Sequence, residues 1–187
     1  MLTSLKRLFK HSVVYGLGSV LNRLIGFILL PLYTRYLTTV DFGISSLLLT
    51  TNSVATIMAQ WGIGSALFRE VIYNDRDEGE VESTALFFLV GEAFLFFGAL
   101  VLLSEQISTL IFGDNSQTFL LRLTFLTGFL QMVQVVFMAR LRIREQSTLY
   151  AVISVGRFLV INGLNIYYVA ILERGVAGLV MASLVTT

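Results

Sequence analysis

Hydrophobic residues form long, nearly unbroken stretches along this chain, separated by short polar segments. A helix needs about 20 mainly apolar residues to cross a membrane, at a rise of about 1.5 Å per residue. Five stretches reach that length, near residues 12–36, 43–63, 83–104, 117–139 and 147–172. A sixth begins at Gly175 and is still apolar at Thr187, where the sequence ends before it is long enough to span. Barrel strands alternate apolar and polar positions over about ten residues, so continuous stretches favour helices.

The pattern therefore predicts an all-α fold, a polytopic transmembrane helix bundle with five complete spans plus a truncated sixth. We expect residues 1–187 to form a single transmembrane domain, since the loops are short and contain no linker or soluble domain. The first apolar stretch is longer than the apolar core of a signal peptide, and no small-residue cleavage site follows it. We expect it to stay in the protein as a span.

Composition agrees with a membrane protein and excludes several kinds of chemistry. Of the 187 residues, 56% are hydrophobic and 13% are charged, whereas a soluble domain has about 25% charged residues. With no Cys and one His, the chain can build no disulfide, thiolate nucleophile or histidine metal cluster. Nor does it contain a nucleotide-binding loop, a paired acidic site or a nucleophile–base arrangement. We therefore expect no enzyme activity, no cofactor, no metal and no nucleic-acid partner.

The positions of Lys and Arg predict how the chain crosses the membrane. Basic residues concentrate in cytoplasmic loops of membrane proteins. Two residues, Arg35 and Arg174, lie on one predicted side. The other side includes the N-terminal segment and holds Lys6, Arg7, Lys10, Arg69, Arg76, Arg140, Arg142 and Arg144. This bias predicts a multi-pass protein of the cell inner (cytoplasmic) membrane with its N-terminus in the cytoplasm.

Polar residues within the spans recur at helical spacing. Steps of three, four or seven residues keep side chains on one face of a helix. Small and hydroxyl side chains at such spacing are typical of helix–helix packing, but stripes that also contain Asn and Gln favour a shared polar cavity. The stripe of the first span includes Asn22, and that of the second consists of Ser45, Asn52, Thr56 and Gln60. The fourth span has Thr124, Thr127, Gln131 and Gln134, and the fifth has Asn162, Asn165 and Tyr168.

Charged residues within the spans are stronger candidates for function. A charge at a helix centre costs about 2.5–3.5 kcal/mol on insertion scales, so it faces the bundle interior. Arg23, Glu92 and Arg157 are placed in this way, whereas Arg122 lies near a span end and fits a structural role. One Glu does not neutralise two Arg, so the interior suits an anionic guest, and a guanidinium binds phosphate oxygens well. The alternative is a structural ion pair between Glu92 and Arg157.

These features give a set of candidate site residues. We expect Glu92 to be the ion-coupling residue, if the protein couples transport to protons or sodium. The expected substrate-binding residues of the cavity are Asn22, Arg23, Gln131, Gln134, Arg157, Asn162 and Asn165.

Several segments resemble a known family. The opening LKRLFKHSVVYGLGSVLNRLIGFILLPLYTRYLTTVDFGISSLL contains a turn of the type L-x-x-x-[DE]-[FY]-G, from Leu37 to Gly43. QWGIGSALFRE, ARLRIREQSTLYAVIS and LERGVAGLVMASLVTT follow in matching order and spacing. Together they resemble the N-terminal half of polysaccharide-export flippases, in the multidrug/oligosaccharidyl-lipid/polysaccharide exporter superfamily.

The resemblance implies a mechanism and partners. Two six-helix lobes would alternate between inward-open and outward-open states and move a polyprenyl-diphosphate-linked oligosaccharide. Arg23 matches in position the cationic residues in the first helix of the related lipid II flippases. The implied partners are membrane lipids, the lipid-linked substrate, the C-terminal half of the same transporter and the polysaccharide polymerase machinery.

Two other functions remain open from the sequence. One is a cation-coupled multidrug antiporter, although that branch usually carries an acid in its first helix and Asp41 here lies beyond it. The other is a non-transporting membrane scaffold, in which the polar stripes serve packing alone.

Overall fold

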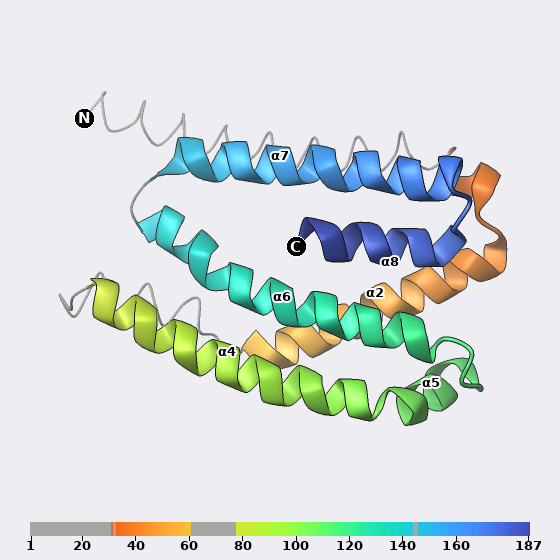
Figure 1. The fold of residues 1–187 in the computed structure, drawn as a ribbon, viewed down its shortest axis with the longest axis horizontal. Helices are drawn as coiled ribbons and strands as arrows, with labels where there is room; N and C mark the ends of the chain where they lie inside the picture. Colours follow the sequence, from red (N-terminus) through yellow and green to blue (C-terminus); the bar gives the residue numbers. More distant parts are fainter. Residues whose placement is uncertain (1–30, 32, 61–77, 144–145) are drawn as a thin grey trace, which may run out of the picture.

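The computed structural model describes residues 31, 33–60, 78–143 and 146–187. In this part of the chain the regular structure is entirely helical, with no strand, which confirms the predicted all-α class. The first predicted span, 12–36, lies mostly outside the described residues. The elements are α2 (Thr39–Gln60), α4 (Glu78–Leu102), α5 (Ser104–Phe112), α6 (Thr118–Ile143), α7 (Ser147–Ile166), a π-helical turn η1 (Tyr167–Ile171) and α8 (Gly175–Thr186) (Figure 1).

Three stretches of helix in the described residues are long and apolar enough to cross a membrane: Thr39–Gln60, Thr118–Ala139 and Thr148–Ile171. A fourth candidate combines Leu86–Leu102 with Ser104–Phe112, two helices that meet at an angle of 61°. The apolar helix α8 is shorter. The predicted count of five spans and a partial sixth therefore stays a prediction.

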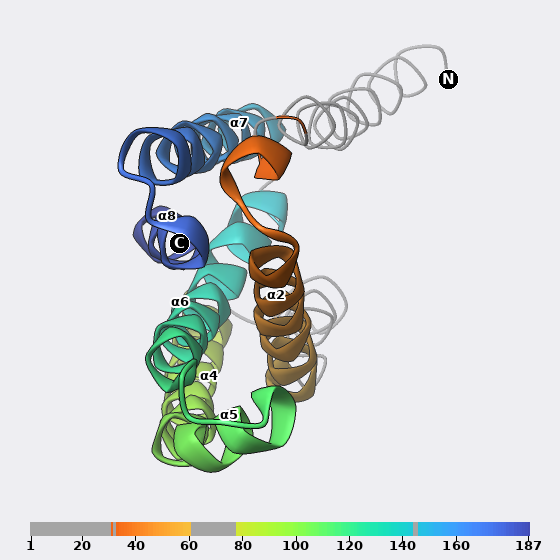
Figure 2. The ribbon, with the colours of Figure 1, turned by 90° about the vertical axis from the view of Figure 1, so that its right-hand side faces the viewer.

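Helix α6 lies at the centre of the described bundle. It packs against α2, α4, α7 and α8 along its length and against α5 near its start. Helices α4 and α7 lie on opposite sides of it in both ribbon views (Figures 1 and 2). The start of α2, helix α5 and the turn between α7 and α8 lie at one end, and the α6–α7 turn lies at the other. From α4 onward, successive connections thus lie at alternate ends, as membrane crossings require.

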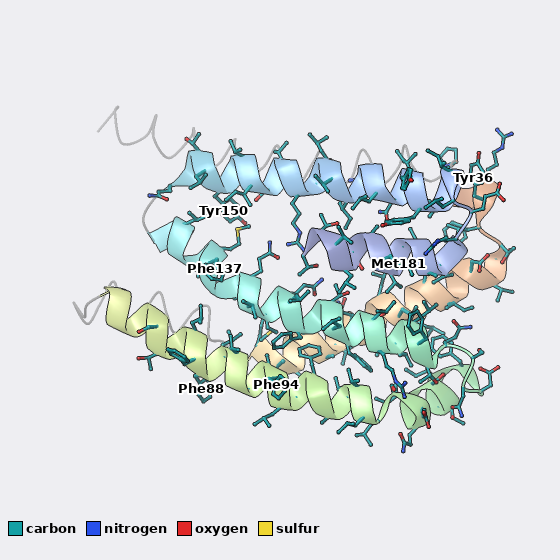
Figure 3. All side chains as sticks on the ribbon, in the orientation of Figure 1. Tyr36, Phe88, Phe94, Phe137, Tyr150 and Met181 are labelled. Atoms are coloured by element: carbon teal, nitrogen blue, oxygen red, sulfur yellow. The ribbon has the colours of Figure 1, made fainter. Side chains whose placement is uncertain are left out.

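The core follows the helical spacing of apolar residues. Its largest fully buried side chains come from the facing surfaces of α2, α4 and α6: Leu48, Leu89, Phe97, Leu121, Phe125 and Met132. Many large apolar side chains instead point out of the bundle, such as Phe88 on the outer side of α4 (Figure 3). Exposed apolar surface of this extent is unusual on a soluble protein and is typical of contact with lipid.

The turn from Leu37 to Gly43 is a helix start held by two local devices. Asp41 Oδ2 accepts hydrogen bonds from the Thr38 backbone N–H (2.9 Å) and hydroxyl (2.7 Å), and Thr38 Oγ1 accepts one from the Asp41 N–H (3.2 Å). This reciprocal capping satisfies donors that a helix start leaves unpaired. Leu37 is buried, and Phe42 packs against the same core cluster. One apolar residue before the cap and one after it form a hydrophobic staple, which gives the family pattern a physical cause.

Helix α5 was not predicted by the hydropathy pattern. It begins at Ser104, immediately after the bend that ends α4, and stops at Gly113, whose φ of 83° is the left-handed conformation that glycine adopts readily. In the loop that follows, Asp114 accepts hydrogen bonds from the Ser116 hydroxyl and backbone N–H. These bonds hold the pKa of the Asp114 carboxyl below its ordinary value.

Gly128 allows α6 to approach α2 and α4 closely. A Cβ built at this position would lie 2.6 Å from Asn52 Oδ1 and 2.8 Å from Phe97 Cζ. Both atoms belong to side chains that are buried in the described core, so they have little room to move. Small residues of this kind let helices pack closely within membranes.

We predict that Gly128→Ala destabilises the protein. The added methyl group overpacks the three-helix contact, and overpacking typically costs about 1–3 kcal/mol. Thermal unfolding of the purified protein in detergent measures the effect. Gly98→Ala on α4 is the control, because a Cβ there meets nothing within 4 Å. Equal unfolding temperatures for the two variants would contradict the close contact.

Candidate functional site

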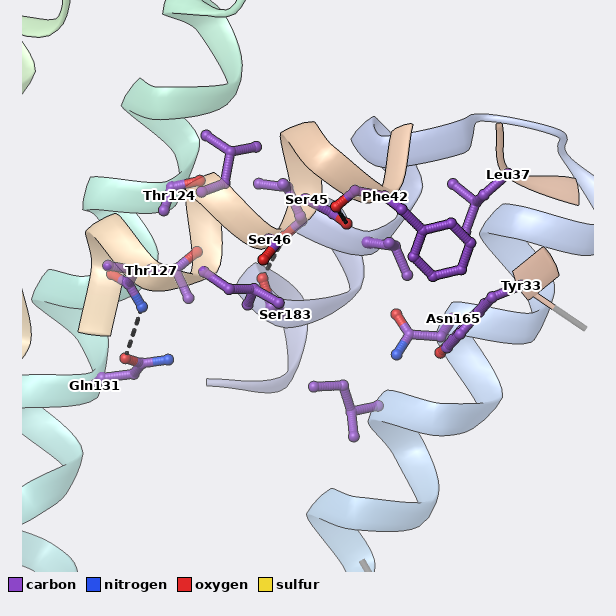
Figure 4. Close-up of a pocket in the computed structure, with 16 residues that line it drawn as sticks. Tyr33, Leu37, Phe42, Ser45, Ser46, Thr124, Thr127, Gln131, Asn165 and Ser183 are labelled. Atoms are coloured by element: carbon purple, nitrogen blue, oxygen red, sulfur yellow. Dashed lines mark hydrogen bonds between the residues drawn. The ribbon is translucent and has the colours of Figure 1, made fainter. Parts of the chain in front are cut away.

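A cavity of about 410 Å³ lies between α2, α6, α7 and α8 (Figure 4). None of the described residues that line it is Asp, Glu, Lys, Arg or His. The wall thus mixes apolar side chains with neutral hydrogen-bonding groups. Its lining residues are Tyr33, Leu37, Phe42, Ser45, Ser46, Leu48, Leu49, Asn52, Thr124, Thr127, Gln131, Ile161, Asn165, Leu179, Val180 and Ser183.

On the α2–α6 side, the cavity wall contains a hydrogen bond between the two helices. Asn52 Nδ2 donates to Gln131 Oε1 at 3.1 Å, as the dashed line in Figure 4 marks. The nearby hydroxyls of Thr124 and Thr127 donate to the carbonyls of Leu120 and Leu123 in their own helix, at 2.7 and 2.9 Å. Each hydroxyl oxygen keeps acceptor capacity after this donation. This side of the cavity is therefore rich in acceptors.

On the α7 side, Asn165 lies beside Tyr33 and interacts with it through its side chain (Figure 4). The Oδ1 atom of Asn165 is buried and has no hydrogen-bond partner among the described residues. Buried amide oxygens are rarely left in this state. This oxygen can accept a hydrogen bond from a hydroxyl or amide group of a guest.

Arg157 and Gln134 form a second polar contact, between α7 and α6. The half-buried guanidinium donates through Nη1 to Gln134 Oε1. Both residues lie about one helical turn from lining residues of the cavity, Ile161 on α7 and Gln131 on α6. A guanidinium has five N–H donors, so this contact leaves capacity for an anion at the edge of the cavity.

The structure brings together some of the predicted substrate-binding residues but not others. Gln131 and Asn165 line the cavity, and Gln134 and Arg157 contact each other one turn away. Asn162 turns its amide back to the carbonyl of Phe158 in its own helix, at 2.7 Å. Asn22 and Arg23 lie outside the described residues.

Sequence reasoning overlooked several lining residues as site candidates. Asn52, Ser45, Thr124 and Thr127 belong to the polar stripes, so the spacing did signal them. Ser46 and Ser183 are not among the stripe residues, and the packing of α2 and α8 brings them to the cavity.

Glu92 lies apart from this cavity. It belongs to α4, in a shallow hollow whose described lining comes from α4 alone, including Phe88 and Gly91. Since α4 and α7 lie on opposite sides of α6, this position does not support a Glu92–Arg157 ion pair. Among the described residues, no cluster of three or more His, Asp or Glu could hold a metal ion.

Arg122 has structural partners at the bend between α4 and α5. Its Nε donates to Ser104 Oγ at 2.9 Å, and its Nη2 forms a salt bridge with Glu105 at 3.1 Å. The residue thus joins the start of α6 to the start of α5, which agrees with the structural role expected of it.

Long apolar helices around a neutral polar cavity define a polytopic, membrane-embedded helical protein. A family model described as polysaccharide biosynthesis protein matches residues 8–186. The chain belongs to this family, which confirms the resemblance found in the sequence. No curated protein and no solved structure matches the chain.

We predict that the cavity is accessible to water within the membrane. Because residues 1–187 contain no Cys, Ser183→Cys and Val185→Cys each add the one thiol of this region, and any cysteine elsewhere in the full-length protein is first replaced. Ser183 lines the cavity and Val185 is exposed on the outer side of the same helix. A small water-soluble methanethiosulfonate reagent should modify Ser183→Cys faster than Val185→Cys. The reagent reacts with the thiolate, and a thiol that faces lipid ionises less than one that faces water. Equal or reversed rates in membrane vesicles would contradict a hydrated cavity.

Proposed function

We propose that this chain is the N-terminal part of a flippase that moves a polyprenyl-diphosphate-linked oligosaccharide across the cytoplasmic membrane for surface polysaccharide biosynthesis. Family membership supports the role in polysaccharide biosynthesis. The observation that carries the proposal is the neutral cavity of about 410 Å³ with its hydroxyl and amide lining. Neutral sugars carry many hydroxyls and no charge, so they need donors and acceptors of this kind.

The diphosphate of such a cargo needs a cation near the cavity. Arg157 is the candidate in the described bundle, since its guanidinium lies one turn from the cavity and is oriented by Gln134. Arg23 is the second candidate, from its match to the family pattern. The lipid tail would remain in the bilayer while the sugars occupy the polar cavity.

Transport requires a second lobe in this proposal. Transporters commonly bind substrate near the midplane between two repeats that move against each other as rigid bodies. The C-terminal half of the protein would supply that lobe, and the two would alternate access to a shared cavity. We place the N-terminus in the cytoplasm, on the side of the basic loops, and propose no catalytic step in this chain. The polysaccharide polymerase machinery would be a partner.

We predict that Asn165→Leu and Arg157→Ala reduce surface polysaccharide when each is expressed from the full-length gene in a deletion strain. A neutral hydrogen bond is worth about 1 kcal/mol and one to a charged group about 1.5–3 kcal/mol. These energies correspond to about fivefold and at least tenfold lower flux. Leu159→Ala, at an exposed position of α7, is the control and should leave output unchanged. Immunoblots establish equal protein levels.

The outcomes separate the competing functions. Undiminished polysaccharide in both variants, at normal protein level, would overturn the proposed roles of the cavity and the guanidinium. Dye efflux that depends on a proton or sodium gradient and is lost in Glu92→Gln would instead indicate the antiporter. If polysaccharide output falls only in proportion to a lower protein level, the polar residues serve stability alone, which would indicate a scaffold.

A further inference from the structure

Helix α5 buries two serines beside Ile107 and Phe112, which pack against the core, and exposes leucines on its outer side. Ser104 and Ser108 are fully buried, at 0% exposure. Leu103, which precedes the helix, is 49% exposed and Leu110 is 85% exposed. These two leucines are seven residues apart and so lie on one face. A surface helix in water normally directs its apolar face to the core.

The buried serines attach α5 to the protein through polar contacts. Ser104 Oγ accepts from Arg122 Nε at 2.9 Å, and Ser108 Oγ donates to the Asp114 carbonyl at 2.8 Å. The salt bridge from Arg122 to Glu105 adds a third contact at the same end of the helix. These contacts hold the inner side of α5 against the protein, and Leu103 and Leu110 face outward.

The apolar surface of α5 continues that of α4. Leu95 and Leu102 on α4 are 73% and 82% exposed, and Leu103 and Leu110 follow them across the bend. The apolar part of α4, Leu86–Leu102, rises about 25 Å at about 1.5 Å per residue. This length is slightly less than the hydrocarbon thickness of about 30 Å. The bend of 61° therefore falls close to a membrane surface.

We propose that α5 is an interfacial helix embedded in the phospholipid surface, and that Arg122 holds it there. Leu103 and Leu110 insert among the acyl chains, whereas Thr109 and Glu105, which are exposed around the helix, face the headgroups and water. Amphipathic helices bind membrane surfaces in this way, with the apolar face at the boundary of the acyl chains. Figure 2 shows α5 turning aside from the direction of α4 at the end of the bundle. This anchor does not depend on the identity of the cargo.

The test uses a single thiol in the full-length protein, carrying an environment-sensitive fluorophore. Within this Cys-free region, Leu110→Cys places the fluorophore on the apolar face and Thr109→Cys places it on the polar face. Any cysteine in the rest of the protein is first replaced. The labelled proteins are reconstituted into phosphatidylcholine–phosphatidylglycerol vesicles. Lipids with a spin label on the acyl chain should quench the fluorophore at 110 at least threefold more than at 109, and aqueous iodide should do the opposite.

Other outcomes overturn the proposal. Strong iodide quenching at both positions would place α5 in water. Weak iodide quenching at both positions would place α5 within the membrane as a continued span. Arg122→Gln supplies a second measurement, because it removes the contacts to Ser104 and Glu105. Acyl-chain quenching at position 110 should then fall about twofold or more while the protein remains folded. Unchanged quenching would show that Arg122 does not hold the helix.

Discussion

Within a bilayer, water reaches a polar side chain only at a hydrated cavity, so most polar side chains bond partners inside the protein. Helix α6 illustrates how this constraint organises the bundle. The hydroxyls of Thr124 and Thr127 bond carbonyls of their own helix, Gln131 bonds Asn52 on α2, and Gln134 bonds Arg157 on α7. Because the two glutamines bond different helices, α6 joins α2 to α7 along its polar face. The neutral cavity opens between the helices that these bonds connect.

The sequence predicted the helices and the polar side of several of them, because both depend on local periodicity. The expected spans at 117–139 and 147–172 correspond closely to α6 and to α7 with η1. Helical spacing places Thr127 and Gln131 on one face of α6, and the packing of α2 against α6 brings Asn52 to that face. The turn at Leu37 was recognised only as a family pattern, and its staple and cap now supply the reason for its residue types.

Features that depend on partners or on side-chain rotation could not be predicted. Asn162 has the spacing of a cavity residue, but its amide can equally bond a carbonyl four residues earlier, and it does so. Glu92 is the one charged residue in the sequence from Leu86 to Leu102, and nothing in its spacing tells which neighbour that face meets. The hydropathy pattern does not predict helix α5, because serines share its buried side with Ile107 and Phe112 while Leu110 points outward. Each of these depends on the packing of other helices around the residue.

Polar pairing between Asn52 and Gln131 stabilises the packing of α2 against α6 within the membrane. The most direct measurement is a double-mutant cycle of Asn52→Ala and Gln131→Ala, followed by unfolding of the protein in bicelles. We expect the double variant to lose less stability than the sum of the single variants, by about 0.5–1.5 kcal/mol. Strictly additive losses would contradict it, because they would mean that the two amides contribute nothing to each other.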